Sequence, residues 1–195
     1  MKKESLVMGI AGVLLGLLAG WIIGSQQAAP ARTEVAAAPA AQPAPGAQQT
    51  QPLDETRAAT LKATADANPK DVASRTQLGN LYFDAGRFEE AAKWYTASLD
   101  VNPKDADVST DLGISYYYMN QADRALAQFE RSLQIDPRHS KTLLNIGIVR
   151  AWGKQDLEGA AKAWEKVVEV APNSEEAARA KQGLDGIRAA HPASK

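Results

Sequence analysis

Apolar residues recur at helical spacing in two adjacent segments of the chain, residues 72–84 and residues 88–101. Such spacing places apolar side chains on one face of an α-helix, so each segment is predicted to form an amphipathic helix. Gly86 interrupts the pattern between them. Pro103 ends the second segment, because proline has no amide hydrogen and disfavours a helical conformation in the residue before it. The predicted inward positions of this helix–turn–helix unit are Leu78, Gly79, Leu81, Tyr82, Ala91, Ala92, Tyr95, Ser98 and Leu99.

The same unit returns along the chain at a nearly fixed interval. Its terminal prolines are separated by 34, 34 and 35 residues and are Pro69, Pro103, Pro137 and Pro172. One extra residue between Gly147 and Ala160 accounts for the longer interval. The positions that match across the three units are Leu78, Leu112 and Ile146, then Gly79, Gly113 and Gly147, then Tyr95, Phe129 and Trp164. A fixed period of this length indicates stacked units rather than one irregular globule.

These in-phase glycine, aromatic and proline positions resemble the tetratricopeptide repeat, a helix–turn–helix unit of the same period. The resemblance implies an all-α solenoid of three repeats over residues 70–103, 104–137 and 138–172. Residues 53–69 are expected to form a flanking half-repeat, and residues 173–191 a capping helix with one apolar face. The chain departs from the family where Arg75, Ser109 and Leu143 occupy a position that often holds tryptophan.

The N-terminal part of the chain predicts a membrane anchor followed by a linker. Residues 6–23 carry no charge, and a segment of this length can span a bilayer as a helix. Lys2 and Lys3 precede it, which favours a cytoplasmic N-terminus and a repeat domain in the periplasm, beyond a bacterial inner membrane. We expect one transmembrane helix within residues 1–24 and a disordered Ala/Pro/Gln-rich linker over residues 25–52. A cleaved signal peptide is the alternative, although its apolar core is usually shorter.

Glycine falls at every fourth position of this predicted span, at Gly12, Gly16, Gly20 and Gly24. Small residues at this spacing form one ridge of a helix and permit close approach of a second transmembrane helix. The ridge therefore predicts association within the membrane, either with another copy of the chain or with a different membrane protein.

Catalytic and metal-binding motifs are missing from the sequence. The chain has no cysteine and two histidines, His139 and His191, neither with a partner at metal-ligand spacing. It contains no nucleophile motif and no glycine-rich phosphate loop. Its net charge of −1 does not provide the basic surface that nucleic-acid binding requires. We therefore expect no enzyme activity, no cofactor, no metal and no nucleic-acid partner.

In stacked repeats of this family, the first helices line a concave groove, where side chains are free of core packing. The resemblance implies that this groove binds a protein or peptide partner. The predicted groove residues are Asn80, Phe83, Asp84, Ile114, Tyr117, Tyr118, Lys141, Leu144, Asn145, Ile148 and Trp152. By register, the lining also includes Thr76, Asp107, Thr110 and Asp111.

Some members of the family grip a C-terminal carboxylate with a clamp of basic and amide side chains. Asn80, Lys141 and Asn145 retain a fragment of that clamp. Thr76 and Asp111 stand where the clamp has lysine and asparagine. The resemblance therefore implies a partial clamp.

An anchor, a linker and a short repeat array facing the periplasm resemble the accessory proteins of bacterial cytochrome c maturation. In those proteins the repeat domain holds the tail of the apocytochrome near haem lyase. The likeness is closest in residues 156–160 and 164–167. It implies a non-catalytic module that holds a partner polypeptide in its groove. The alternative is a general periplasmic assembly or chaperone-like scaffold for an envelope or secretion complex.

Overall fold

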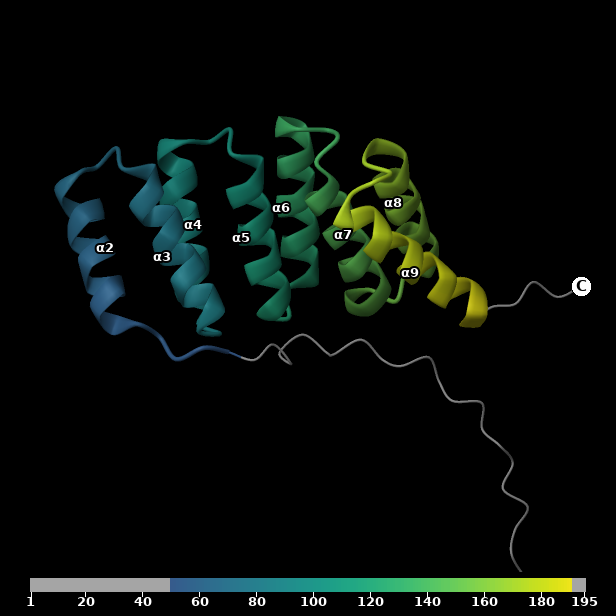
Figure 1. The fold of residues 1–195 in the computed structure, drawn as a ribbon, viewed down its shortest axis with the longest axis horizontal. Helices are drawn as coiled ribbons and strands as arrows, with labels where there is room; N and C mark the ends of the chain where they lie inside the picture. The colour runs from purple at the N-terminus through teal and green to yellow at the C-terminus, as the bar shows by residue number, and fades with distance from the viewer. Residues whose placement is uncertain (1–49, 191–195) are drawn as a thin grey trace, which may run out of the picture. The chain divides into compact units, whose positions relative to one another are not determined.

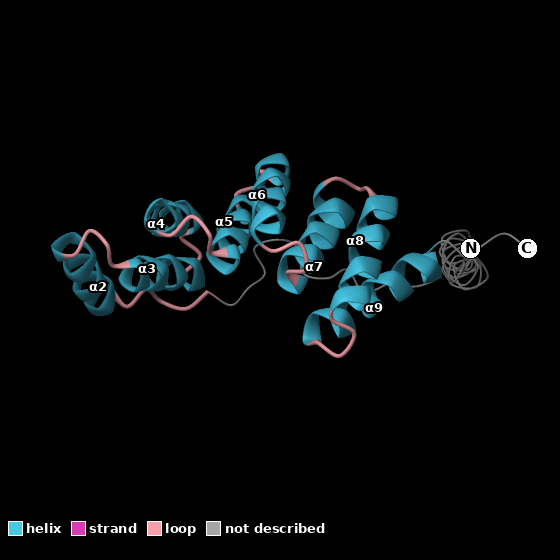
Figure 2. Cartoon of the chain, turned by 90° about the horizontal axis from the view of Figure 1, so that it is seen from above, coloured by secondary structure: helices cyan, strands magenta, loops and turns pink. Residues whose placement is uncertain are grey.

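The computed structural model describes residues 50–190 of the chain, and this part is entirely helical. The elements are α2 (Glu55–Ala67), α3 (Val72–Asp84), α4 (Phe88–Val101), α5 (Ala106–Tyr118), α6 (Ala122–Ile135), α7 (Ser140–Ile148), the π-helical turn η1 (Val149–Gly153), α8 (Leu157–Val170) and α9 (Glu175–Ala190). Helices α2 to α8 follow one another in one row, and α9 runs obliquely across α7 and α8 (Figure 1). In the view from above, α4 and α6 lie along one side of the row, and α3 and α7 along the other (Figure 2).

The predicted N-terminal features lie outside the described residues. These features are the transmembrane anchor over residues 1–24, its glycine ridge at Gly12, Gly16, Gly20 and Gly24, and the linker up to residue 49. Within residues 50–190, no helix has the length and apolar character needed to cross a membrane. The structure therefore describes the repeat domain alone.

The Asp that follows each Pro-Lys pair starts the next first helix. The Asp71 carboxylate accepts a hydrogen bond from the Ser74 amide at 3.2 Å, and the Asp105 carboxylate accepts one from the Val108 amide at 3.0 Å. Such N-caps satisfy amide groups that have no partner within the helix. Hydrogen bonds from Ser74 lower the pKa of the Asp71 carboxyl below its ordinary value. In the third repeat His139 takes this position and makes no side-chain cap.

The recurring glycines mark the points where the two helices of a repeat approach most closely. A Cβ atom on Gly113 would lie 2.5 Å from Cε1 of the buried Phe129 ring. Gly79 faces Tyr95 and Gly147 faces Trp164 in the same way. An aromatic side chain of the second helix therefore fills the space that each glycine leaves open on the first.

The residue at the position that often holds tryptophan in the family makes different contacts in each repeat. Arg75 donates to the backbone oxygens of Ala65 and Asn68, at 3.0 and 3.2 Å, and so satisfies the C-terminal end of α2. Ser109 is fully buried and contacts Gln128 and Ser132 through hydrogen bonds of 2.7 and 2.9 Å. Leu143 packs in the core of the third repeat. The departures change local packing and leave the fold intact.

The extra residue of the third repeat is accommodated at the end of its first helix. There α7 passes into the π-helical turn η1, in which the Lys154 amide donates to the oxygen of Val149, five residues earlier, at 3.1 Å. A π-helical turn holds one more residue than an α-helical turn. Ala160, Trp164 and Val167 downstream are fully or almost fully buried, as the period requires.

Each repeat turns between its helices through one residue with positive φ. These residues are Gly86 at 72°, Asn120 at 59° and Gln155 at 56°. Only glycine adopts this left-handed region without steric cost, and asparagine tolerates it better than glutamine does. Gln155 therefore carries the largest backbone strain of the three.

Replacing Gln155 with glycine is expected to raise the free energy of unfolding by about 0.5–1 kcal/mol, because the left-handed conformation then costs little. The side chain of Gln155 is exposed, so its removal takes no core contact away. Urea denaturation measures the change, with Gln155→Ala as the control that keeps the strain. Equal stability of the glycine and alanine variants would contradict the strain at this turn.

Candidate functional site

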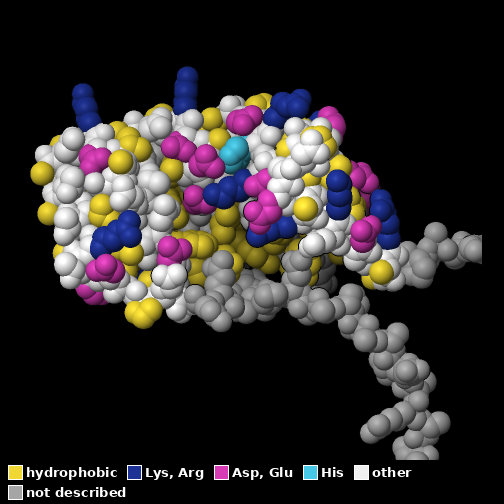
Figure 3. Space-filling model, in the orientation of Figure 1, with side chains coloured by type: hydrophobic (Ala, Val, Ile, Leu, Met, Phe, Trp, Pro, Cys, Tyr) yellow, Lys and Arg dark blue, Asp and Glu magenta, His cyan; other side chains and the backbone are white. Residues whose placement is uncertain are grey.

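A pocket of about 460 Å³ opens on the concave face of the row. Figure 3 shows it as a hollow with hydrophobic side chains in its depth and charged side chains above them. First helices α3, α5 and α7 contribute most of the lining, and α9 closes one side. The lining residues are Phe83, Tyr95, Asp111, Ile114, Tyr118, Lys141, Leu144, Asn145, Ile148, Glu175, Glu176 and Arg179.

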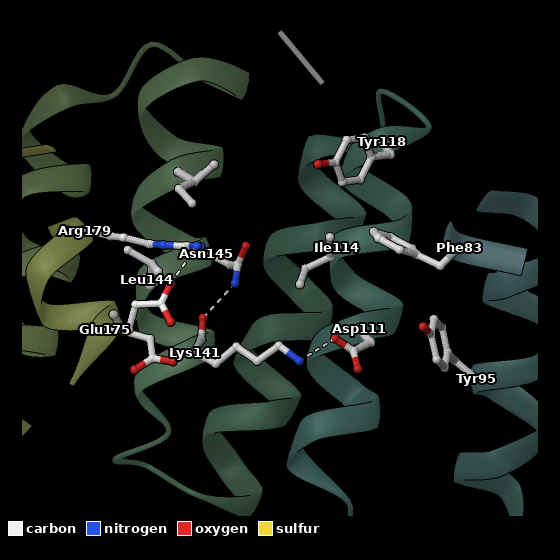
Figure 4. A pocket seen from close by; sticks show the side chains of 12 residues that line it. Phe83, Tyr95, Asp111, Ile114, Tyr118, Lys141, Leu144, Asn145, Glu175 and Arg179 are labelled. Atoms are coloured by element: carbon white, nitrogen blue, oxygen red, sulfur yellow. Dashed lines mark hydrogen bonds and ion pairs between the residues drawn. The ribbon is translucent and has the colours of Figure 1, made fainter. Parts of the chain in front are cut away.

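The apolar side of the pocket combines aliphatic residues with a packed aromatic cluster. Tyr118 stacks on Phe88 with ring centroids 4.7 Å apart, and Phe83 meets both rings edge-on at 5.5 and 5.2 Å. Ile114 faces the pocket from α5, between the helices that carry Phe83 and Leu144 (Figure 4). Edge-on and stacked contacts fix the rings in place. The apolar surface is thus held in shape by contacts among its own side chains.

The polar side of the pocket contains an ion pair that joins two repeats. Lys141 Nζ of α7 lies 2.7 Å from Asp111 Oδ1 of α5, as Figure 4 shows. Burial raises the pKa of the Asp111 carboxyl above its ordinary value, and the charge of Lys141 acts in the opposite direction. Asn145 donates to the backbone oxygen of Lys141 at 2.8 Å. The charge of Asp111 and the hydrogen-bond donors of Lys141 and Asn145 therefore have partners within the chain.

Tyr95 reaches the pocket from the second helix of the first repeat. Its hydroxyl donates to Asn80 Oδ1 at 2.8 Å. Burial, followed by the nearby charges of Asp111 and Asp84, raises the pKa of the Tyr95 hydroxyl well above its ordinary value. Tyr95 therefore stays a neutral hydrogen-bond donor and keeps the Asn80 carbonyl engaged.

Three charged residues at the start of α9 close one side of the pocket. Arg179 lies 2.8 Å from Glu175, and both side chains are mostly exposed. Hydrogen bonds from its own backbone, then from Ser174, lower the pKa of the Glu176 carboxyl below its ordinary value. Glu176 therefore remains negatively charged at neutral pH.

Seven of the eleven predicted groove residues line this pocket, and they come from three different repeats. These are Phe83, Ile114, Tyr118, Lys141, Leu144, Asn145 and Ile148. The structure thus brings together side chains that are separated by more than sixty positions in the sequence. Asp111, which lies in the lining by register, is also among them.

Four predicted groove residues do not line the pocket. Asn80 is engaged by Tyr95, and Asp84 lies exposed at the end of α3. Tyr117 turns toward the core cluster of Ala125, Phe129 and Val149. Trp152 lies on η1, where its ring is 5.7 Å from that of Trp164, and it is 42% exposed.

The wider first-helix candidates are engaged between helices. Thr76 hydrogen-bonds Ser98 at 2.7 Å, and Thr110 hydrogen-bonds Thr142 at 2.6 Å. Asp107 lies 3.3 Å from His139. These contacts join neighbouring helices and repeats, and none of the three residues lines the pocket.

The residues that sequence reasoning did not place in the lining are Tyr95, Glu175, Glu176 and Arg179. Tyr95 was assigned to the core by its period, and its hydroxyl nevertheless reaches the pocket edge. The α9 residues belong to a helix predicted only as a cap. The period could have indicated them, because Glu176 lies 35 positions after Lys141, the same interval that separates Pro137 from Pro172. By that register, α9 is the first helix of an incomplete fourth unit.

Removing Lys141 is expected to cost more than removing its partner. The variant Lys141→Met leaves the Asp111 charge in a mostly buried site without a counter-ion, so the free energy of unfolding should fall by about 1–3 kcal/mol. The native pKa of Asp111 is raised, so the native state binds its proton more tightly than the unfolded state does. The loss should therefore shrink as pH falls from neutral to mildly acidic. Urea denaturation at both pH values measures it.

The matched control is Asp111→Asn, which removes the charge that burial disfavours and leaves a partly exposed lysine to water. This variant should be about as stable as the wild type. An equal loss in both variants, or a loss for Lys141→Met that grows as pH falls, would contradict this assignment.

A row of helical hairpins with a concave groove defines an α-helical repeat protein of the solenoid class. Sequence models of the tetratricopeptide repeat family match residues 71–138 and residues 110–178. Together they span more than half of the 195-residue chain. The chain belongs to the tetratricopeptide repeat family, which confirms the repeats predicted from the proline period. This fold typically serves protein interaction rather than catalysis.

Several solved structures have the same fold. The crystal structure of MamA has a TM-score of 0.61 at 19% identity and covers 68% of this chain and 75% of that chain. The first repeat domain of Spaghetti (RPAP3), bound to the HSP90 peptide SRMEEVD, has a TM-score of 0.56 at 26% identity and covers 63% and 94%. The type III secretion translocator chaperone SycD of Yersinia enterocolitica has a TM-score of 0.60 at 18% identity and covers 65% and 98%. A search of curated proteins finds no match.

Proposed function

We propose that the repeat domain is a non-catalytic binding module that holds a partner polypeptide in its concave groove. The observation that carries this proposal is the pocket of about 460 Å³, which has an apolar side and a polar wall. Pockets of this size commonly combine an apolar lining with a few polar groups that set orientation. Ile114, Leu144 and Ile148 contribute apolar surface that can receive a side chain of an extended peptide.

The structure of the RPAP3 repeat domain supports the same use. It is 26% identical to this chain and holds a peptide of HSP90. A peptide bound to a repeat domain of the same fold supports peptide binding as the use of this domain.

We further propose that the domain is tethered to a bacterial inner membrane by the N-terminal span of residues 6–23 and works in the periplasm. The support is the uncharged segment after Lys2 and Lys3. A fusion of a periplasm-dependent reporter to the C-terminus tests this placement. An inactive reporter on a stably expressed fusion would contradict it.

Service in cytochrome c maturation remains our proposal for the pathway, with a general envelope scaffold as the alternative. The run that carries this likeness forms the start and the buried face of α8. There Asp156 caps the helix through the Gly159 amide at 2.8 Å, and Trp164 is 2% exposed. Co-purification of an apocytochrome with the full-length chain would support the first proposal. Normal cytochrome c assembly in a strain that lacks the chain would favour the scaffold.

Peptide binding in the groove is tested with a random peptide library selected on the full-length chain in detergent. Selected peptides should bind the wild type, and their affinity for the Ile148→Asn variant should be about tenfold or more lower. The polar amide removes apolar surface that the anchoring side chain of the peptide would contact. Ile114→Asn, in a different repeat, is the second test variant.

Trp152→Ala is the matched control, since it removes a large exposed side chain outside the pocket. Circular dichroism verifies that each variant is folded. Peptides that bind both asparagine variants as well as the wild type would overturn the groove as the site.

A further inference from the structure

The pocket wall carries more negative than positive groups. Its carboxylates are Asp111, Glu175 and Glu176, and its cationic groups are Lys141 and Arg179. Lys141 pairs with Asp111 at 2.7 Å, and Arg179 pairs with Glu175 at 2.8 Å. Glu176 has no cation within ion-pair distance among residues 50–190. The lining therefore carries one more negative than positive side chain.

The donors that could hold a peptide carboxylate are already used inside the chain. Lys141 Nζ is bound to Asp111, and the Asn145 amide donates to the backbone of Lys141 at 2.8 Å. A carboxylate placed here would also meet the Asp111 carboxylate, which occupies a position that holds asparagine in a carboxylate clamp. Like charges at close range in a partly desolvated site repel one another strongly. The wall thus disfavours a free C-terminus and acidic side chains.

A cationic side chain of a ligand would be attracted to this wall. It adds a counter-charge beside Glu176 and can share Asp111 with Lys141, so it relieves an excess of negative charge. The apolar residues Ile114, Leu144 and Ile148 line the same pocket as these acids. Figure 4 shows Ile114 and Leu144 on either side of the Lys141–Asp111 pair. A ligand that satisfies both surfaces carries an apolar side chain close to a lysine or arginine.

We propose that the groove selects an internal peptide segment in which an apolar side chain lies next to lysine or arginine, and discriminates against free C-termini and acidic segments. This inference rests on the proposed function of peptide binding. The apolar pocket provides the anchor, and the acidic wall determines which partners are accepted, because charge complementarity contributes mainly to specificity.

The test uses two random peptide libraries selected on the full-length chain, one displayed with both ends fused and one with a free C-terminus. The fused library should yield peptides enriched in lysine or arginine beside apolar residues. A synthetic consensus peptide, acetylated and amidated, is then titrated against the variants. Its affinity should fall about three- to tenfold in Asp111→Asn and in Glu176→Gln. It should stay unchanged in Trp152→Ala, and it should weaken with added salt.

The peptide SRMEEVD, which the RPAP3 domain holds, is the opposing probe when its C-terminus is free, because its three acidic residues and its terminal carboxylate outnumber its one arginine. It should show no binding to the wild type under the conditions in which the consensus peptide binds. Enrichment of acidic peptides, or of peptides that require a free C-terminus, would overturn the charge preference and leave peptide binding in place. Failure of both libraries to yield binders that depend on Ile148 would instead overturn the proposed function itself.

Discussion

Gly113→Ala is expected to lower the free energy of unfolding by about 3 kcal/mol, at the upper end of the usual cost of overpacking. The added methyl would lie 2.5 Å from Cε1 and 2.6 Å from Cδ1 of Phe129. Phe129 is fully buried, so its ring cannot move away without displacing other core side chains. Glycine to alanine in a helix normally stabilises by about 1 kcal/mol. The close approach of α5 and α6 therefore reverses the sign of the substitution.

Gly186→Ala in α9 is the matched control. Beyond its chain neighbours and its own helix backbone, no atom lies within 4 Å of the Cβ position of Gly186, so this variant should be more stable than the wild type by up to about 1 kcal/mol. In a double variant, Phe129→Leu should reduce the cost of Gly113→Ala, because the smaller side chain leaves room for the methyl. Urea denaturation of the wild type, the three single variants and the double variant measures these differences. A Gly113→Ala variant that unfolds at the same urea concentration as the wild type would show that the helices do not approach this closely.

Trp164→Ala is expected to lower the free energy of unfolding by about 3–5 kcal/mol, as for other large core aromatics. Trp164 is 2% exposed, and its Nε1 donates to the backbone oxygen of Leu144 at 3.2 Å. Its ring occupies space that is open because Gly147 of α7 and Gly183 of α9 have no Cβ atom. Its removal therefore leaves a cavity between three helices. Thermal and urea denaturation followed by circular dichroism measure the loss.

Trp152→Ala provides the comparison within the same repeat. Trp152 contacts Trp164 but is 42% exposed, so its removal should cost less than about 1.5 kcal/mol. Only Trp164→Ala should remove the fluorescence of a fully buried tryptophan. Similar losses of stability in the two variants would mean that the third repeat does not depend on a single central side chain.

The proline period was sufficient to predict the repeats and their core. It identified Gly113 opposite Phe129 and Gly147 opposite Trp164 as in-phase positions, and these pairs are in contact. The reason is physical: in a solenoid each unit packs only on its neighbours, so the same local contacts recur with every period. Residues such as Leu78 and Ala91 could therefore be assigned to the interior from the sequence alone.

The groove was harder to predict because its side chains are free to choose partners far along the chain. The Lys141–Asp111 pair joins residues 30 positions apart, and register alone does not show that it forms. Tyr117 and Tyr118 are neighbours in sequence, yet one turns to the core and the other faces the pocket. Such choices depend on distances between helices of different repeats, which a repeat pattern does not contain.

The π-helical turn η1 also affects how the chain tolerates changes in length. Deleting one residue there would rotate everything beyond it on the first helix by about 100°, the angle between successive residues of an α-helix. Trp152 would then leave the ring of Trp164, against which it now rests. The wider π-helical turn accommodates the inserted residue before α8 begins. Ala160 and Trp164 of α8 are therefore buried, like the matching residues of the other repeats. The single inserted residue is therefore confined to this turn, and the helices beyond it keep the register of the other repeats.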